Sequence, residues 1–141
     1  MKIAIEAQRI FRLNKHGMDF VALETIRELQ KRNDGNHYFV IVAPGEDHCL
    51  KESANLSIIE LKCPSYPLWE QIALPKTVKR LGVDLLHCTS NTAPLRCPVP
   101  LVLTLHDIIY LEPRQYRTPS LYQEMGWHYR RLVVPHILKV C

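Results

Sequence analysis

The stretch Leu101-Val102-Leu103-Thr104-Leu105-His106-Asp107 says most about how this chain of 141 residues folds. Its first five residues are mainly apolar and partly β-branched, a pattern typical of a buried strand in a parallel sheet. Two polar side chains, His106 and Asp107, follow at once. Because ligands of open α/β sheets bind in the crevice beyond the carboxyl ends of the strands, these two residues are candidates for a functional site.

Strand and helix patterns alternate along the rest of the chain. Strands are predicted at Lys2–Ala7, His37–Ala43, Leu56–Leu61, Asp84–Cys88 and Val99–Leu105, and helices at Asp19–Arg32, Leu68–Leu81 and Ser120–Lys139. Asp19 is the predicted N-cap of the first helix, Pro75 predicts a kink or break in the second, and Pro135 predicts an interruption of the third. Right-handed crossovers then favour a Rossmann-like, doubly wound parallel sheet of about five to six strands in an α/β fold.

Length and composition are those of one soluble globular domain, with 47% hydrophobic and 23% charged residues. No apolar run approaches the roughly 20 residues that span a bilayer. The N-terminus enters a strand pattern directly and shows no secretory signal, which favours the cytoplasm. The five cysteines have no C-x-x-C spacing, so neither structural zinc nor a redox dithiol is predicted. His87, Cys88 and His106 also lack a metal-ligand spacing, and no metal is expected.

The net charge of +4 originates in the last part of the chain. Residues 114–141 hold five of the 18 Lys and Arg residues, namely Arg114, Arg117, Arg130, Arg131 and Lys139, but only one of the 14 Asp and Glu residues. Such a segment could face phosphates or contact an anionic membrane peripherally. The alternative is a solvated helix face whose acidic partners lie elsewhere. No nucleic-acid partner is expected.

Polar loops follow the predicted strands at the same edge of the sheet. After the first strand, Gln8 and Arg9 begin a loop that reaches Gly17, where a helix opens. A glycine at a helix N-terminus can let a phosphate approach the free N–H groups, or it can be a flexible turn. The single glycine matches neither G-x-G-x-x-G nor a Walker pattern.

A second polar run surrounds the end of the strand at Asp84–Cys88. His87, Thr89, Ser90 and Asn91 offer an imidazole, two hydroxyls and an amide, which are suitable hydrogen-bond partners for a sugar or a ribose. The alternative is a loop whose side chains satisfy its own backbone.

His106 and Asp107 can both serve a sugar, since a neutral imidazole donates or accepts and a carboxylate accepts or acts as a base. Adjacent residues of an extended chain point in opposite directions, so Asp107 could instead cap the following turn. Trp69 could stack on a sugar ring or pack against the sheet. No G-x-S-x-G elbow supports a nucleophilic serine.

Several motifs resemble one enzyme family in their order and spacing. They are Trp69-Glu70-Gln71 with Leu74-Pro75, Asp84-Leu85-Leu86-His87, Ala93-Pro94 with Val99-Pro100, and Thr104-Leu105-His106-Asp107 followed by Leu111-Glu112-Pro113. Together they resemble the N-terminal domain of the family-four (group 1) retaining glycosyltransferases of the GT-B class. Gly17, followed by a helix, stands where that family has a glycine-rich loop.

The resemblance implies that residues 1–141 are the acceptor-side domain of an enzyme that transfers a hexose from a nucleotide-sugar, with retention, to a lipid-linked or polysaccharide-precursor acceptor. The donor-binding C-terminal domain of the GT-B fold would lie outside these residues, so the 141 residues alone are expected to be inactive. His106 and Asp107 would be catalytic, and Gly17 would approach the donor diphosphate. Members are usually metal-independent, so no cofactor is expected. The alternative is a non-enzymatic, flavodoxin-like binding or interaction module.

Overall fold

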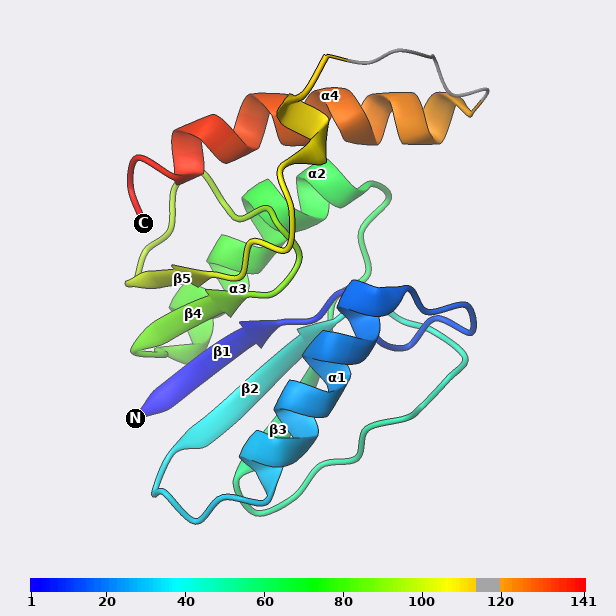
Figure 1. The fold of residues 1–141 in the computed structure, drawn as a ribbon. Coiled ribbons are helices and arrows are strands. Elements are labelled where there is room, and N and C mark those ends of the chain that lie inside the picture. The colour runs from blue at the N-terminus through cyan, green and yellow to red at the C-terminus, as the bar shows by residue number, and fades with distance from the viewer. Residues whose placement is uncertain (114–119) are drawn as a thin grey trace.

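The computed structural model describes residues 1–113 and 120–141, which form a parallel sheet flanked by helices on both faces (Figure 1). The five strands are β1 (Lys2–Glu6), β2 (His37–Val42), β3 (Leu56–Glu60), β4 (Leu85–Cys88) and β5 (Leu101–Leu103). Their order is β3-β2-β1-β4-β5, and every pair of neighbours is parallel. The sequence-based prediction of a Rossmann-like doubly wound sheet is confirmed, with five strands.

The chain begins at the centre of the sheet and builds outward in two directions. It first adds β2 and β3 on one side of β1, then crosses over to add β4 and β5 on the other side. The direction of winding therefore reverses between β1 and β4. In an open α/β sheet this switch point is where the loops beyond the strands diverge and leave room for a ligand.

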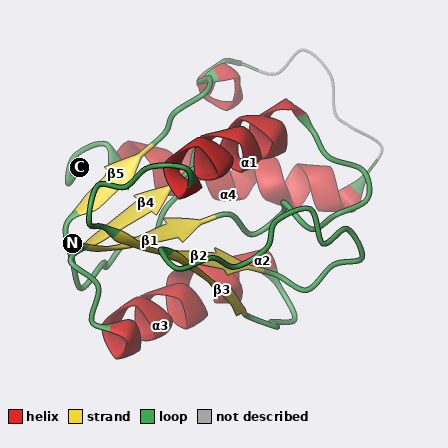
Figure 2. Cartoon of the chain, turned by 90° about the horizontal axis from the view of Figure 1, so that it is seen from below, coloured by secondary structure: helices red, strands yellow, loops and turns green. Residues whose placement is uncertain are grey.

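The helices lie on both faces of the sheet, as Figure 2 shows for α1 and α3 on opposite sides. The helix α1 (Gly17–Gln30) covers one face. The segments α2 (Tyr66–Leu68), η1 (a π-helix, Trp69–Ala73), α3 (Leu74–Leu81) and α4 (Leu121–Ile137) contribute to the other, and a short 3₁₀ turn, η2 (Ile109–Leu111), follows β5. Alternate residues of β1 divide between the two cores, with Ile5 packed beneath α1 and Ala4 on the opposite side. This alternation is the period of two that an extended strand imposes.

The first helix begins two residues before the predicted range, and its N-cap lies three residues before the predicted one. The N-cap is His16, not Asp19, and the helix starts at Gly17. The carboxylate of Asp19 accepts the N–H of His16 at 2.9 Å from within the first turn. An acidic residue satisfies an otherwise unpaired N–H from this position as well as from the N-cap, which is why the pattern misplaced the boundary.

The two predicted proline effects have different outcomes. Before Pro75 the helix is indeed irregular, because the π-helix η1 precedes α3 directly. The prediction of an interruption near Pro135 is wrong, since α4 runs through it to Ile137. Pro135 removes one N–H donor in the last turn, where little helix remains to be broken. The strand predicted at Val99–Leu105 is shorter, Leu101–Leu103, because prolines precede it and the chain turns away after it.

Candidate functional site

A buried carboxylate ties the end of β1 to the loop after β4. Glu6 is the last residue of β1 and only 1% exposed. Its carboxylate accepts the backbone N–H of Gln8 at 2.9 Å, the N–H of Thr89 at 3.2 Å and the hydroxyl of Ser90 at 3.0 Å. The hydroxyl of Thr89 also donates to the backbone carbonyl of Glu6 at 2.8 Å. The polar run after β4 is therefore held inward by Glu6.

Asn91 joins this loop to the segment that follows β5. Its side-chain oxygen accepts the backbone N–H of His106 at 2.6 Å, and its own N–H donates to the carbonyl of Thr104 at 3.2 Å. The residue is 2% exposed and has a φ of 67°, in the left-handed region. Asn tolerates this conformation better than most residues other than Gly, which explains its presence at this turn.

Hydrogen bonds with Asn91 and Thr89 hold His106 and fix the orientation of its ring. The ring atom Nε2 lies 2.8 Å from the carbonyl oxygen of Thr89. A carbonyl can only accept, so Nε2 carries a hydrogen, and in the uncharged form of such a ring Nδ1 is an acceptor. The half-buried side chain makes no hydrogen bond through Nδ1 to any described residue. The site thus holds one imidazole nitrogen in place at the carboxyl edge, and no described residue makes a hydrogen bond to the other.

Asp107 lies beside it and is exposed. Its Oδ1 atom accepts the N–H of Ile109 at 3.3 Å, which caps the short turn η2. The carboxylate therefore performs the capping role that was one of the two sequence-based alternatives, while remaining open to solvent. This leaves an acceptor next to the imidazole, though one that already has a structural task.

The side chains of His87 and Trp69 are engaged in contacts within the fold. The His87 ring lies 2.7 Å from the hydroxyl of Thr104, and burial lowers the pKa of the imidazole. Trp69 is 1% exposed, donates from Nε1 to the carbonyl of Leu61 at 3.0 Å and stacks on Tyr66 at an interplanar angle of 9°. Its ring packs in the core on the α3 face. For Trp69 the structure shows the packing alternative, with no ring face open to a sugar.

Gly17 is exposed at the start of α1. A Cβ atom built on it would have no neighbour within 4 Å, so the packing of the described residues does not require glycine there. Asp19 places a negative charge in the same turn, and it is paired with Arg9 at 3.0 Å. The helix terminus is accessible, and its local charge is balanced by this pair.

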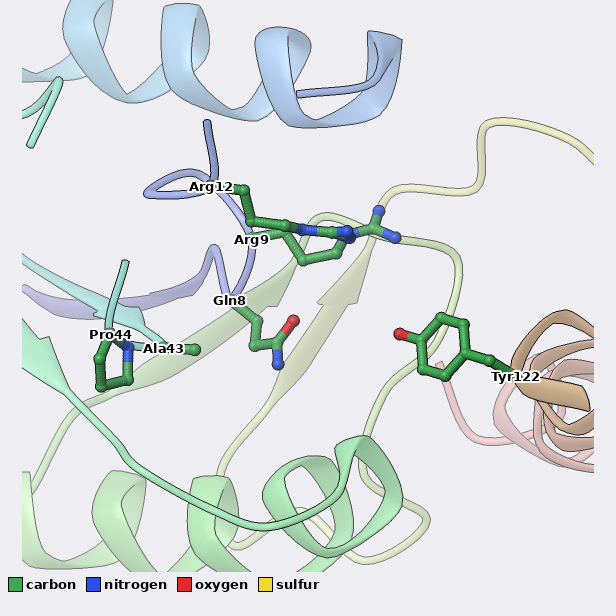
Figure 3. Close-up of a pocket in the computed structure, with 6 residues that line it drawn as sticks. All are labelled: Gln8, Arg9, Arg12, Ala43, Pro44 and Tyr122. Atoms are coloured by element: carbon green, nitrogen blue, oxygen red, sulfur yellow. The ribbon is translucent and has the colours of Figure 1, made fainter. Parts of the chain in front are cut away.

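A cavity of about 280 Å³ opens beside these loops at the carboxyl ends of β1 and β2 (Figure 3). It is lined by Gln8, Arg9, Arg12, Ala43, Pro44 and Tyr122. Sequence reasoning noted Gln8 and Arg9 but not Arg12 or Tyr122. No local pattern marks those two residues, because Tyr122 reaches the cavity from α4, far along the chain.

A second buried carboxylate, that of Glu70, has a structural role that the sequence analysis did not predict. Glu70 is fully buried and accepts hydrogen bonds from Tyr66 at 2.7 Å and from the hydroxyls of Thr92 and Tyr129. Burial is the main cause of the raised pKa of this carboxyl. Because Tyr129 belongs to α4, Glu70 fastens that helix to the loop after β4. In the sequence, Glu70 stood out only as part of the motif Trp69-Glu70-Gln71.

Within residues 1–113 and 120–141, no three His, Cys, Asp or Glu side chains gather closely enough to hold a metal ion. None of the helices in the described part of the chain has the length and apolarity needed to cross a bilayer.

Comparison with known proteins identifies the family. Residues 16–140 match the sequence model described as Glycosyltransferase Family 4. Comparisons with curated proteins and with solved structures give no significant match. The matched range covers most of the chain and includes α1, the loop after β4, His106 and α4. The chain therefore belongs to glycosyltransferase family 4.

Proposed function

We propose that this chain is the acceptor-side, N-terminal domain of a retaining glycosyltransferase with GT-B architecture. The enzyme would transfer a hexose from a nucleotide-sugar to a lipid-linked or polysaccharide-precursor acceptor in the cytoplasm. Family membership supports transferase chemistry with a sugar donor and an acceptor. Within that family, the sequence motifs around Trp69 and His106 favour the retaining, GT-B reading over a non-enzymatic, flavodoxin-like module.

The immobilised ring of His106 is the observation that carries this proposal. Thr89 and Asn91 fix the residue at both its side chain and its backbone N–H. Nδ1 could then accept a hydrogen bond from a hydroxyl of the donor sugar without reorganising, which is the property that makes a positioned group effective in catalysis. Asp107 would be a second polar contact, and the backbone at Gly17 would approach the donor diphosphate.

A second, donor-binding domain would complete the site across a cleft. Holding donor and acceptor together converts a bimolecular encounter into an effectively unimolecular step, so either domain alone should be nearly inert. Positive groups from the second domain would stabilise the departing diphosphate, and the transfer needs no metal in this proposal. Residues 1–141 supply the acceptor side and the imidazole.

Peripheral contact with an anionic membrane belongs to the same proposal. On α4, Leu121, Met125 and Leu132 are exposed, and Arg131 is exposed beside them. Exposed apolar side chains with neighbouring cations are the combination that binds a helix to an anionic interface. Arg114 and Arg117, which the sequence analysis included in the basic segment, lie outside the described residues.

The experiment that tests the function uses the full-length protein with a panel of nucleotide-sugars. Transfer or hydrolysis of one donor class is expected, and the anomeric configuration of the product is read by proton NMR. Retention supports the proposal, and inversion contradicts its retaining step. If no nucleotide-sugar is turned over and none binds, the non-enzymatic interpretation replaces it.

The membrane contact is tested separately by sedimentation with vesicles. Replacing Arg130 and Arg131 together by Gln should weaken binding to anionic vesicles but not to neutral ones. Replacing Lys79 and Arg80 together by Gln, at the exposed end of α3, is the matched control for the loss of two charges. Unchanged binding of the Arg130 and Arg131 variant would contradict a membrane role for α4.

A further inference from the structure

The cavity beside the candidate site has the composition of an anion site. Among its six lining residues there are two guanidinium groups and no carboxylate. In Figure 3 the side chains of Arg9 and Arg12 both extend from their loop toward Tyr122, and the amide of Gln8 lies below them in the view. Guanidinium, amide and phenol groups are all hydrogen-bond donors, so the cavity offers donors converging on one space.

One edge of the Arg9 guanidinium is ion-paired, whereas one of its terminal nitrogens has no hydrogen-bond partner among the described residues. Its Nε atom lies 3.0 Å from Oδ1 of Asp19, and the side chain is only 18% exposed. Its Nη2 atom is buried and has no hydrogen-bond partner among the described residues. A buried charged donor without an acceptor is costly, so this guanidinium has donor capacity that the described residues do not use.

Arg12 supplies the charge that is not already neutralised. Its guanidinium makes no ion pair or hydrogen bond with any described residue. Two acidic groups of the neighbouring segments are paired with other cations, Asp19 with Arg9 and Asp47 with Lys15. Glu6 is buried beneath its own loop contacts. Among the residues that line the cavity, Arg12 therefore carries a charge that no described residue pairs.

The loop that carries both arginines is fixed to the rest of the fold. The ammonium of Lys15 donates to the carbonyl of Arg12 at 2.9 Å, and the N–H of Asp47 donates to the carbonyl of Phe11 at 3.0 Å. A Cβ atom on Gly45 would lie 2.2 Å from that same Phe11 carbonyl, so the two loops are in close backbone contact. Because the backbone is preorganised, binding would require little ordering of this loop.

We propose that this cavity binds a phosphoryl group carried by the acceptor. Two guanidinium groups facing one space match the tetrahedral oxygens of a phosphate better than a lone ammonium would. A volume of about 280 Å³ is roughly nine times the share of one water in the liquid, which admits a phosphoryl group and part of what it is attached to. Neither Gly17 nor His106 lines the cavity, so it is separate from the contacts proposed for the donor.

The assignment to the acceptor rests on the proposed function, whereas the phosphate site rests on the cavity itself. A phosphorylated acceptor could be a soluble sugar phosphate or a lipid phosphate. Both share the chemistry that Arg9 and Arg12 would recognise, and the test separates them.

The experiment measures binding, without turnover, to the full-length protein. Three probes are titrated by calorimetry: glucose 6-phosphate, phosphatidylcholine vesicles doped with phosphatidic acid, and uridine diphosphate as a donor-side ligand. Each is compared for the wild type, Arg12→Gln and Arg80→Gln, which removes the same charge from the far end of α3. Melting temperatures verify folding, and Arg12→Lys is a further variant that keeps the charge but not the planar fork.

Arg12→Gln should weaken binding of glucose 6-phosphate or of the phosphatidic acid vesicles by about tenfold or more, with Arg80→Gln unchanged. The probe that shows this effect identifies the soluble or the lipid source. The proposal is overturned if the wild type binds neither probe, if both variants lose affinity equally, or if Arg12→Gln weakens uridine diphosphate binding to the same degree. Phosphate binding that depends on Arg12 in a protein that turns over no nucleotide-sugar would preserve the site and refute the proposed transferase function.

Discussion

Replacing Asn91 tests how the imidazole of His106 is held. In the structure the Asn91 side chain accepts the N–H of His106 at 2.6 Å while its own backbone has a φ of 67°. Substitution by Ala removes the acceptor and keeps a side chain in the left-handed region. Substitution by Gly removes the acceptor but relieves that backbone cost.

The expected magnitudes follow from these two contributions. Leaving the N–H of His106 without its partner costs about 1–3 kcal/mol, and the left-handed conformation costs Ala about 1–2 kcal/mol. Asn91→Ala should therefore lower the free energy of unfolding by about 2–5 kcal/mol. Asn91→Gly escapes the conformational cost but adds unfolded-state entropy worth about 0.5–1 kcal/mol, so it should be the more stable variant by about 0.5–1 kcal/mol.

Urea unfolding of the full-length protein measures both values, and Asn91→Asp is the control that keeps an acceptor oxygen. Both the Ala and Gly variants should also lose turnover by about tenfold to a hundredfold, because a displaced catalytic group costs rate even when it is still present. At an ordinary backbone position Ala is more stable than Gly. The same order at position 91, or full turnover in both variants, would refute the proposed anchoring of His106.

The remaining predictions concern packing and burial. Gly45→Ala should lower the free energy of unfolding by about 1–3 kcal/mol, because its Cβ would meet the Phe11 carbonyl at 2.2 Å. Gly126→Ala, within α4 and with nothing within 4 Å of its Cβ, should instead stabilise by about 0.5–1 kcal/mol, and urea titration compares the two. Burial raises the pKa of Glu70 above 4.5, so the folded state binds more protons and this group's contribution to stability falls as pH rises from 4.5 through the folded-state pKa. Glu70→Gln should remove that decline, and parallel slopes for both proteins would contradict the burial argument. Trp69→Phe should cost about 1–3 kcal/mol of stability through its lost indole hydrogen bond while leaving the KM for both substrates unchanged; a raised KM would restore the sugar-stacking role.

The fold was predictable because each strand is a short apolar run between turn signals. Residues such as Ile5, Val40 and Leu86 are fully or almost fully buried, and their pattern indicated as much. Boundaries were less predictable, because a side chain such as Asp19 can satisfy a helix terminus from more than one position. Pro135 misled for a related reason, since its missing N–H matters little in a final turn.

The candidate site was predictable only in part. The strand end at residues 101–103 placed His106 at the carboxyl edge correctly. Thr89 and Asn91 resembled ligand contacts in the sequence, but they turn inward because Glu6 and the backbone of His106 recruit their polar atoms. Such pairings join residues more than 80 positions apart in the case of Glu6 and Thr89. No local pattern encodes them.

The cavity shows the same dependence on tertiary structure. Arg12 looks like an ordinary loop cation in the sequence, and only the approach of α4 places Tyr122 across from it. Arg9 and Arg12 can bind one ligand together because the close contact at Gly45 fixes the loop that carries them. A pattern of residue types along the chain predicts neither the approach of α4 to Arg12 nor the close contact at Gly45.

The most direct measurement is the single-turnover transfer rate of His106→Ala in the full-length protein, determined beside its free energy of unfolding. Removing the ring deletes one hydrogen bond to the Thr89 carbonyl, which should cost about 0.5–1.5 kcal/mol of stability. The transfer rate should fall at least about a hundredfold in protein that is still folded, since general acid–base and positioned hydrogen-bonding groups contribute on that order. A rate within a factor of about two of the wild type, or a loss accounted for by unfolding alone, would contradict the assignment of His106 to the reaction.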